Sequence, residues 1–275
     1  MQKSRWALPN SLEVEVRDEI AVLRLTRADK RNALDDETVL GIGRFFADVP
    51  QSARAVVLVA EGDHFCAGLD LGELAERDAV EGVLHSRMWH RALGAMESAS
   101  VPVLAVLKGA VIGGGLELAT AAHLRVAEES TFFALPEGQR GLFVGGGASV
   151  RVSRLIGTQR MTDMMLTGRV LSATEGTRLG LADYLVSDGE GLAKAEQLAA
   201  HIATNSAVTN FAVLQALPRI AEADPETGYV LESLMAGVAQ SSVQAKQRMN
   251  DFLAGRALRI PVPSDTDGES REMRR

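Results

Sequence analysis

The chain has 275 residues, of which 46% are hydrophobic and 24% are charged, and its formal net charge is -7. This composition is typical of a globular protein with a sizeable core, and the negative charge argues against a nucleic-acid-binding surface. Cys66 is the only cysteine, so no disulfide can form within the chain. The N-terminus has no apolar core of the signal-peptide type, and no stretch has the length and purity of a membrane span. We therefore expect a soluble, cytoplasmic protein.

The first two-thirds of the chain alternates short apolar runs with helical patterns. Residues 53–60 form a nearly unbroken apolar run, which is typical of a strand buried on both faces. Asp35 or Asp36 is placed to cap a helix that continues to residue 49. We expect further strands at residues 12–16, 20–26, 102–107, 124–127 and 131–134, and further helices at residues 79–98, 117–122, 148–156 and 159–166. A strand, a helix and another strand are expected within residues 170–186.

The last third of the chain has a different character. Its helical patterns have no strand pattern between them, and they cover residues 192–204, 210–223, 225–240 and 243–254. The sequence therefore predicts an α/β core over residues 1–190 and a helical region over residues 191–256. Residues 257–275 are polar and are predicted to be disordered.

Two glutamates stand in apolar, glycine-rich surroundings. Glu117 lies between Leu116 and Leu118 in GGGLEL, and Glu137 lies in ALPEGQRG. Because burial of an ionised carboxylate is costly, each is expected to be paired or to have a raised pKa. Two carboxylates with different pKa values are suited to general acid–base catalysis. For each glutamate alone, a partly solvated position at the start of a helix is the plain alternative.

The glycine triplets Gly113–Gly115 and Gly145–Gly147 each come just before an expected helix. Such a turn can present backbone amides to an anion, although close helix packing explains a triplet equally well. Neither triplet has the spacing of a dinucleotide-binding or Walker motif. Ser149 follows the second triplet without the G-x-S-x-G pattern of a serine nucleophile, so we assign it no chemistry.

Two further groups of polar residues are open to a plain or a functional interpretation. The loop at residues 27–32, RADKRN, carries three cations, which are either solvated or in contact with a phosphate. His85 and His90 lie in the expected helix at residues 79–98 without the spacing of a metal site. We expect a polar helix face there and no metal ion.

Three segments together resemble the signature segments of the enoyl-CoA hydratase/isomerase (crotonase) superfamily. They are HFCAGLDL at residues 64–71, AVIGGGLELA at residues 110–119 and FALPEGQRGLFVGGG at residues 133–147. RADKRNAL, LTGR and LGLADYLV resemble other landmarks of that family, and the similarity covers about residues 12–256. Each segment alone is weak, but their order and spacing make the combination specific.

The resemblance implies a fold and a type of ligand. The fold is a crotonase-like spiral of repeated ββα units, followed by a C-terminal helical region that builds trimers, which often pair into hexamers. The ligands are acyl-CoA thioesters, and the enolate formed at the thioester carbonyl is stabilised. No separate cofactor is expected because coenzyme A is part of the substrate, and neither nucleic acid nor a membrane is an expected partner.

The resemblance also implies roles for particular residues. The backbone amides of Leu69 and Gly114 would form an oxyanion hole. Glu117 would activate water for attack at C3 and Glu137 would protonate C2, with Gly145 helping to hold the water.

The implied coenzyme A contacts lie in the early loop and in the first signature segment. They are Arg31 and the backbone of Cys66 and Gly68, which leaves the cysteine thiol without a chemical role. Phe252 and Arg256 resemble C-terminal positions that reach coenzyme A in some members of the family.

Some positions depart from the pattern of the family's hydratases. Val144 stands where proline is usual, Leu69 is bulkier than the usual alanine, and Gly138, Gln139 and Arg140 replace an apolar trio. The acyl group is therefore left open. Because both glutamates are present, we expect an enoyl-CoA hydratase-type lyase. The alternatives are another enolate reaction, namely isomerisation, thioester hydrolysis or C–C cleavage, and a non-catalytic acyl-CoA-binding subunit.

Overall fold

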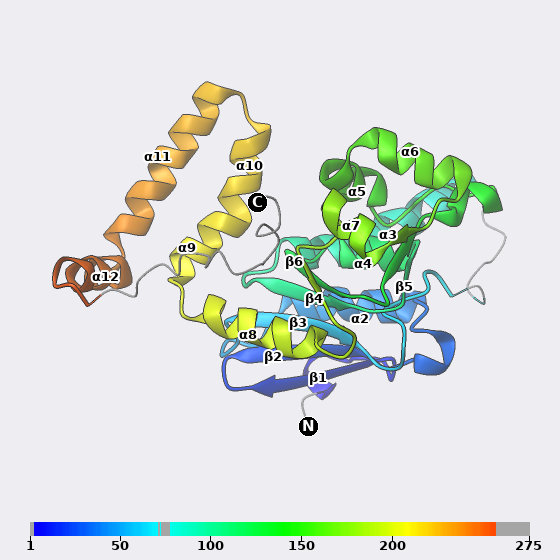
Figure 1. Cartoon of the computed structure of the whole chain (residues 1–275), viewed down its shortest axis with the longest axis horizontal. Coiled ribbons are helices and arrows are strands. Elements are labelled where there is room, and N and C mark those ends of the chain that lie inside the picture. The colour runs from blue at the N-terminus through cyan, green and yellow to red at the C-terminus, as the bar shows by residue number, and fades with distance from the viewer. Residues whose placement is uncertain (1–2, 71, 73–77, 257–275) are drawn as a thin grey trace, which may run out of the picture.

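A six-stranded sheet forms the base of the molecule in the computed structural model, which describes residues 3–70, 72 and 78–256. The strand order is β1-β2-β3-β4-β6-β9 (Figure 1). The strands are β1 (Leu12–Arg17), β2 (Ile20–Leu25), β3 (Ala55–Ala60), β4 (Val103–Leu107), β6 (Leu124–Glu128) and β9 (Tyr184–Val186). Strands β1 and β2 are antiparallel, and every later pair is parallel.

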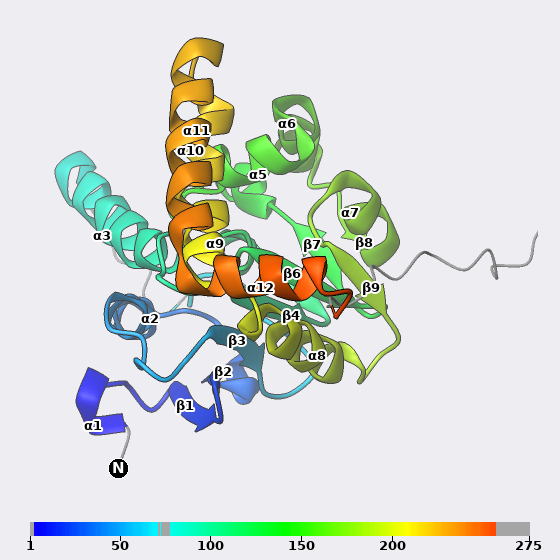
Figure 2. The same ribbon diagram turned by 90° about the vertical axis from the view of Figure 1, so that its left-hand side faces the viewer.

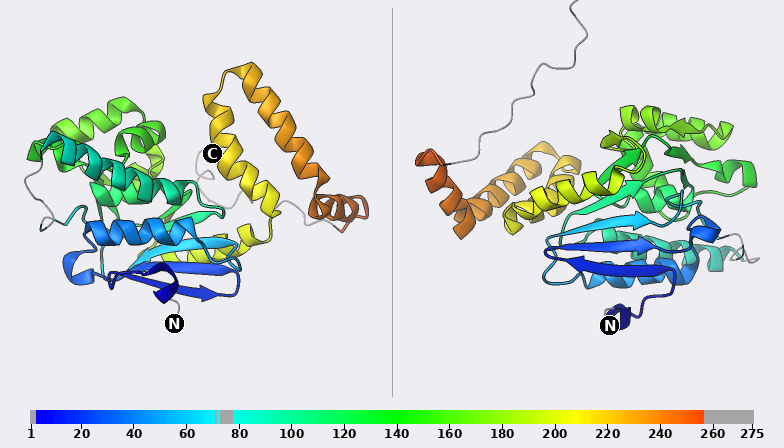
Figure 3. Two further views of the ribbon diagram at one scale, coloured as in Figure 1. Left: turned by 180° about the vertical axis from the view of Figure 1, so that it is seen from behind. Right: turned by 60° about the horizontal axis from the view of Figure 1, so that its bottom comes forward.

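Helices cover both faces of this sheet. Helix α8 (Gly191–Ala203) packs against one face, where Ala195 and Ala199 join a cluster with residues of β3 and β4. Helices α2 (Asp36–Ala47) and α3 (Ala79–Glu97) lie on the other side of the sheet (Figures 1 and 3). Every residue of β3 is buried as a result, which confirms the strand predicted from the unbroken apolar run.

The starts of α2 and α3 follow from their capping residues. The Asp35 side chain accepts a hydrogen bond from the amide of Thr38, so Asp35 is the N-cap of α2 and the Asp36 side chain is left for another contact. Asp78 and Glu81 form a capping box at the start of α3. Both helices begin within one residue of the predicted position.

A second, smaller sheet lies above the first and gives the chain its ββα rhythm. It consists of β5 (Ala110–Ile112), β7 (Phe132–Ala134) and β8 (Leu171–Ser172) in that order. Strands β4 and β5 lead into α4 (Gly114–Ala119), and β6 and β7 lead into the 3-10 helix η3 (Pro136–Arg140). Each glutamate of interest therefore sits on the helical turn that follows a short strand of the small sheet. Strand β5 was not predicted, because only three residues form it.

Helices α5 (Ala148–Ile156), α6 (Thr158–Thr167) and α7 (Ala173–Leu179) complete the core, as Figure 2 shows. The chain then continues through α9 (Ala207–Phe211), the π-helical turn η4 (Ala212–Ala216), α10 (Leu217–Glu222), α11 (Pro225–Ser241) and α12 (Val243–Leu253). In Figures 1 and 3, α10 and α11 form an antiparallel hairpin that projects from the core and ends in α12.

The helix predicted over residues 210–223 is interrupted by that π-helical turn. Pro218 lies at the start of α10, directly after η4. Since proline has no amide hydrogen and its ring clashes with the carbonyl four residues earlier, regular α-helical bonding cannot continue through it. The short N-terminal helix α1 (Lys3–Trp6) was not predicted. Among the described helices, none is long and apolar enough to cross a membrane.

Candidate active site

A cavity of about 670 Å³ brings together the segments that carry the predicted site residues. Its walls come from residues 67–69, α3, the turn that opens α4, η3 and the loop at residues 142–146. Leu69, Gly114, Glu117, Glu137 and Gly145 all line it. The predicted catalytic residues therefore meet at one place, although they span more than 70 positions of the sequence.

The backbone amides of Leu69 and Gly114 lie side by side in this cavity. A Cβ atom added to Gly114 would be 3.4 Å from the nitrogen of Leu69. Within the described ranges, neither amide donates a hydrogen bond to the protein. Two neighbouring donors without acceptors are the arrangement that binds a carbonyl oxygen carrying negative charge.

Glu117 is buried on α4, with only 4% of its surface exposed. Its Oε1 accepts hydrogen bonds from the amides of Gly146, at 2.7 Å, and Ala148, at 3.0 Å. Burial raises the pKa of this carboxyl, while the two amides and the Arg151 guanidinium oppose that effect. The second glycine triplet thus supplies donors to Glu117, and its ionised form is the one these donors favour.

Glu137 has a different environment at the start of η3. Its Oε2 atom is buried without a hydrogen-bond partner among the described residues. Burial raises the pKa of the Glu137 carboxyl, and the charge of Glu117 raises it further. Gly113, which has φ +52°, leaves room for this side chain, because a Cβ there would be 2.6 Å from Glu137 Oε1. The surroundings of Glu137 therefore favour its protonated form.

Two residues that the sequence did not single out hold the turns around Glu117. The ring of Trp89 lies 3.1 Å from a Cβ added to Gly114 and 2.9 Å from one added to Gly146. The Arg151 guanidinium donates to the carbonyl oxygens of Gly146, at 2.5 Å, and Glu117, at 3.3 Å. The contacts of Trp89 with both turns and of Arg151 with Glu117 join segments that are distant in sequence. No local pattern marks Trp89 as more than a core residue or Arg151 as more than a helix cation.

Side chains of α3 form the cavity wall next to these turns, and Asp36 of α2 contacts two of them. His85 Nε2 lies 2.7 Å from Asp36 Oδ1, and the indole nitrogen of Trp89 donates to the same oxygen at 3.3 Å. The Ser86 hydroxyl donates to the carbonyl of Gly145 at 2.7 Å. Among the residues that the structure describes, no group of three or more possible metal ligands occurs, and His85 is paired with the Asp36 carboxylate.

The early loop lies against the first signature segment. The carbonyl of Arg31 accepts a hydrogen bond from the amide of Ala67 at 3.0 Å, and the Arg31 side chain is exposed. Burial raises the pKa of the Cys66 thiol to about 12, so the thiol is un-ionised at neutral pH. Arg27, the first cation of the loop, is bound to Asp35 and Asp70 and serves the structure.

The C-terminal positions are not part of this cavity. Phe252, on α12, is 67% exposed, and Arg256 pairs with Asp251 at 2.8 Å. Neither residue is among those that line the cavity. Helix α12 lies at the end of the projecting hairpin, as Figure 1 shows.

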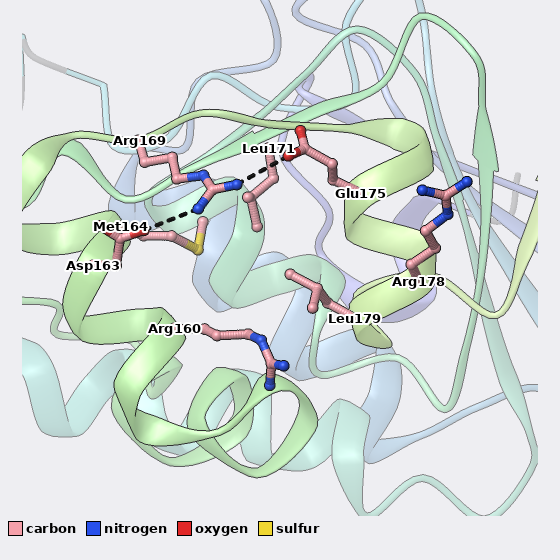
Figure 4. A pocket seen from close by; sticks show the side chains of 8 residues that line it. All are labelled: Arg160, Asp163, Met164, Arg169, Leu171, Glu175, Arg178 and Leu179. Atoms are coloured by element: carbon pink, nitrogen blue, oxygen red, sulfur yellow. Dashed lines mark hydrogen bonds and ion pairs between the residues drawn. The ribbon is translucent and has the colours of Figure 1, made fainter.

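A smaller hollow of about 200 Å³ lies between α6 and α7 (Figure 4). In it, Arg169 extends between Asp163, at 3.3 Å, and Glu175, at 3.0 Å. These ion pairs connect the LTGR segment to α7 and leave this arginine neutralised. We interpret the hollow as a structural contact region between α6 and α7.

The sequence profile of the family described as "Enoyl-CoA hydratase/isomerase" matches residues 15–258. The chain belongs to this family. The match covers the sheet, the cavity and the helical hairpin, so it extends over nearly all of the described structure.

Other members of the enoyl-CoA hydratase/isomerase family are similar along most of their length. The short-chain-enoyl-CoA hydratase of Clostridium acetobutylicum is 28% identical over 252 residues, which are 90% of this chain and 97% of that protein. Enoyl-CoA hydratase EchA19 of Mycobacterium tuberculosis is 30% identical over 223 residues, 79% of this chain and 83% of that one.

Solved structures of the family share the fold. A structure from Rhodopseudomonas palustris with an enoyl-CoA hydratase assignment is 55% identical, with a TM-score of 0.88, and the match covers 90% of this chain and 96% of that one. The enoyl-CoA hydratase of Mycobacterium smegmatis is 26% identical, with a TM-score of 0.86 and coverages of 90% and 98%. The prediction of a crotonase-like α/β fold is thereby confirmed.

Proposed function

We propose that this protein is an enoyl-CoA hydratase that adds water reversibly across the C2–C3 double bond of a 2-enoyl-CoA thioester. The observation that carries the proposal is that Glu117 and Glu137 face one cavity in different hydrogen-bond environments: Glu117 accepts bonds from two backbone amides that favour its ionised form, whereas Oε2 of Glu137 is buried without a partner among the described residues. The relatives named as enoyl-CoA hydratases support it. Addition of water needs both a base and an acid, and this pair supplies one of each.

The mechanism follows from these groups. The substrate's thioester oxygen is bound by the amides of Leu69 and Gly114. Glu117, ionised, takes a proton from water while the water oxygen forms its bond to C3. The π electrons move toward the thioester oxygen, and the resulting enolate is stabilised by the two amides, each of which contributes about 3–4 kcal/mol in sites of this kind. Glu137, protonated, then delivers its proton to C2.

Other residues have supporting roles in the proposal. The loop that contains Gly145 holds the water next to Glu117, and the Ser86 hydroxyl fixes that loop through the Gly145 carbonyl. Arg31 and the backbone of Cys66 and Gly68 contact coenzyme A. The contact between Arg31 and Ala67 supports this assignment because it joins the two segments.

The proposed reaction is tested by incubation of a panel of 2-enoyl-CoA esters in water enriched in heavy oxygen. A hydratase places solvent oxygen at C3 and leaves the thioester intact. Transfer of the double bond without oxygen uptake would indicate an isomerase. Release of coenzyme A with solvent oxygen in the carboxylate would indicate a hydrolase. Tight binding of the esters without any turnover would indicate a non-catalytic binding subunit.

We also propose that the chain assembles as a trimer, or as a hexamer of two trimers, in the cytoplasm. The hairpin helix α11 exposes large apolar side chains: Tyr229 at 69%, Val230 at 59%, Leu234 at 61% and Val238 at 52%. Such a surface is unusually apolar for one that faces water, and a second copy of the chain would cover it. The single, buried cysteine is compatible with a reducing compartment.

A further inference from the structure

One wall of the cavity carries two cations that the proposed chemistry does not use. Arg87, on α3, and Arg140, at the end of η3, both line the cavity and are solvent-exposed. Neither forms an ion pair with an acid in the residues described. Arg140 is also one of the positions that depart from the family's apolar pattern. An arginine without a carboxylate partner at a cavity wall attracts anionic ligands.

The carboxylates that line the cavity form no ion pair with these cations among the described residues, although the charge of Arg140 acts on Glu137 and opposes the rise of its pKa. Among the described lining residues, the acids are Glu117 and Glu137 alone. Glu117 accepts hydrogen bonds from the amides of Gly146 and Ala148, and the positive charge of Arg151 acts on its carboxylate. The surroundings of Glu137 favour its neutral form. The accessible charge on this wall is therefore positive.

Large apolar side chains stand on the same wall. Val83 is 62% exposed, Leu142 is 46% exposed and Phe143 is 72% exposed, and all three line the cavity. An apolar chain laid against them would remove them from water, which favours binding. The wall as a whole thus combines apolar surface with unpaired cations.

This wall is on the acyl side of the proposed oxyanion site. A Cβ on Gly68 would be 3.6 Å from the nitrogen of Gly114, and one on Gly114 would be 3.1 Å from the Trp89 ring. Gly114 therefore lies between the segment assigned to coenzyme A and helix α3. Ser86, one turn before Trp89, contacts Gly145 beside Glu117. A thioester held at Gly114 with its coenzyme A toward Gly68 directs its acyl chain toward α3.

We propose that the preferred substrate is a 2-enoyl-CoA whose acyl chain ends in a carboxylate. The methylene part of the chain packs against Val83, Leu142 and Phe143, and the terminal carboxylate lies in the positive potential of Arg87 and Arg140. This inference rests on the proposed function for the identity of the cavity as an acyl-CoA site. An ion pair at a partly solvated position strengthens binding by up to about fivefold for each cation.

Binding of a matched ligand pair tests the inference without turnover. The probes are saturated acyl-CoA thioesters of six to eight carbons that end either in a carboxylate or in its methyl ester, and calorimetry gives both Kd values. For the unaltered protein, we expect the carboxylate form to bind at least about tenfold more tightly, with a preference that shrinks as salt is added. Arg87→Gln and Arg140→Gln should each reduce the preference by up to about fivefold and leave the ester's Kd unchanged.

Arg91→Gln is the matched control, because Arg91 is an exposed arginine one turn further along α3 that does not line the cavity. It should leave the preference intact. Equal binding of the two probes to the unaltered protein would overturn the inference. An equal loss for both probes in the Arg87 and Arg140 variants would also overturn it, because it would assign these cations to the coenzyme A phosphates. Failure of the proposed function would instead show as absence of hydration of any 2-enoyl-CoA.

Discussion

Glu117 and Glu137 face the same cavity, but their carboxyl groups have different hydrogen-bond environments. Glu117 accepts two backbone hydrogen bonds, at 2.7 and 3.0 Å, whereas Oε2 of Glu137 is buried with no partner among the residues described. The donors favour a negative charge on Glu117, and that charge in turn raises the pKa of Glu137. This difference supports the proposal that Glu117 is the base and Glu137 the acid of the hydration.

The raised pKa of Glu137 predicts how stability depends on pH. A carboxyl whose pKa is higher in the folded protein than in the unfolded chain contributes fully below the unfolded pKa, and the contribution is lost as pH rises through the folded pKa. The Glu137→Gln variant lacks this loss, so its Tm relative to the unaltered protein should increase with pH. The difference in the free energy of unfolding between the variant and the unaltered protein should change by at most about 1.4 kcal/mol per pH unit between the two pKa values.

Thermal unfolding measured from acid to alkaline pH checks this. Glu129→Gln, at an exposed position outside the cavity, is the control and should run parallel to the unaltered protein. A Tm difference for Glu137→Gln that stays constant over the whole range would show that the Glu137 pKa is not raised.

The two glycines of the 145–146 turn should respond differently to alanine. A Cβ on Gly146 would be 2.7 Å from Glu117 Oε2 and 2.9 Å from the Trp89 ring, so Gly146→Ala displaces the proposed base and should lower kcat at least about 100-fold. A Cβ on Gly145 meets nothing nearer than 3.8 Å, and Gly145→Ala should keep most of the activity. Equal effects of the two substitutions on steady-state kinetics would contradict the geometry.

Arg151 is predicted to be a positioning residue for Glu117. Its guanidinium binds the carbonyl oxygens of Glu117 and Gly146, and its charge lowers the pKa of the Glu117 carboxyl against the effect of burial. Arg151→Met should therefore lower kcat more than it changes KM. It should also move the acidic limb of the pH profile of kcat/KM toward higher pH, because a base with a higher pKa becomes protonated at a higher pH.

Arg151→Lys keeps the charge and should leave that limb nearly in place. The other charged or titratable groups that act on Glu117 are His90 from α3 and Glu137 from η3, and neither is altered in these variants. If the methionine variant merely unfolds more easily while its pH profile is unchanged, the role of Arg151 is structural.

The apolar face of α11 predicts the oligomeric state. Leu234, 61% exposed in the single chain, should be buried against another copy. Light scattering at micromolar concentration should give a trimer or hexamer, and Leu234→Glu should shift it toward monomer. Leu166→Glu, at a position that is 79% exposed on α6, is the control and should leave the assembly intact. A monomeric unaltered protein would contradict the proposed assembly.

The sequence predicted those features that depend on local patterns. The apolar run at β3 predicted a doubly covered strand, and the apolar surroundings of Glu117 and Glu137 predicted the raised pKa values. The family resemblance, rather than spacing, brought Leu69 and Gly114 together. The structure places their amides side by side.

Contacts between distant segments were not predicted from sequence. Trp89 touches the turns at Gly114 and Gly146, and Arg151 binds the carbonyl of a residue 34 positions earlier. Such contacts depend on how the spiral stacks its turns, and a helix-face tryptophan or arginine has the same local pattern wherever it packs. Asp35 and Asp36 were both predicted as possible caps; Asp35 caps the helix, and Asp36 contacts His85, which lines the cavity.

The central claim is that both carboxylates take part in hydration, and its most direct test is the rate of water addition by the Glu117→Gln and Glu137→Gln variants. Each should lower kcat by a factor of about 10²–10⁴ while the Kd for a saturated acyl-CoA stays within a few fold of that of the unaltered protein. Glutamine keeps the size and polarity of each side chain, so the fold is retained. Full hydration activity in either variant would contradict the claim.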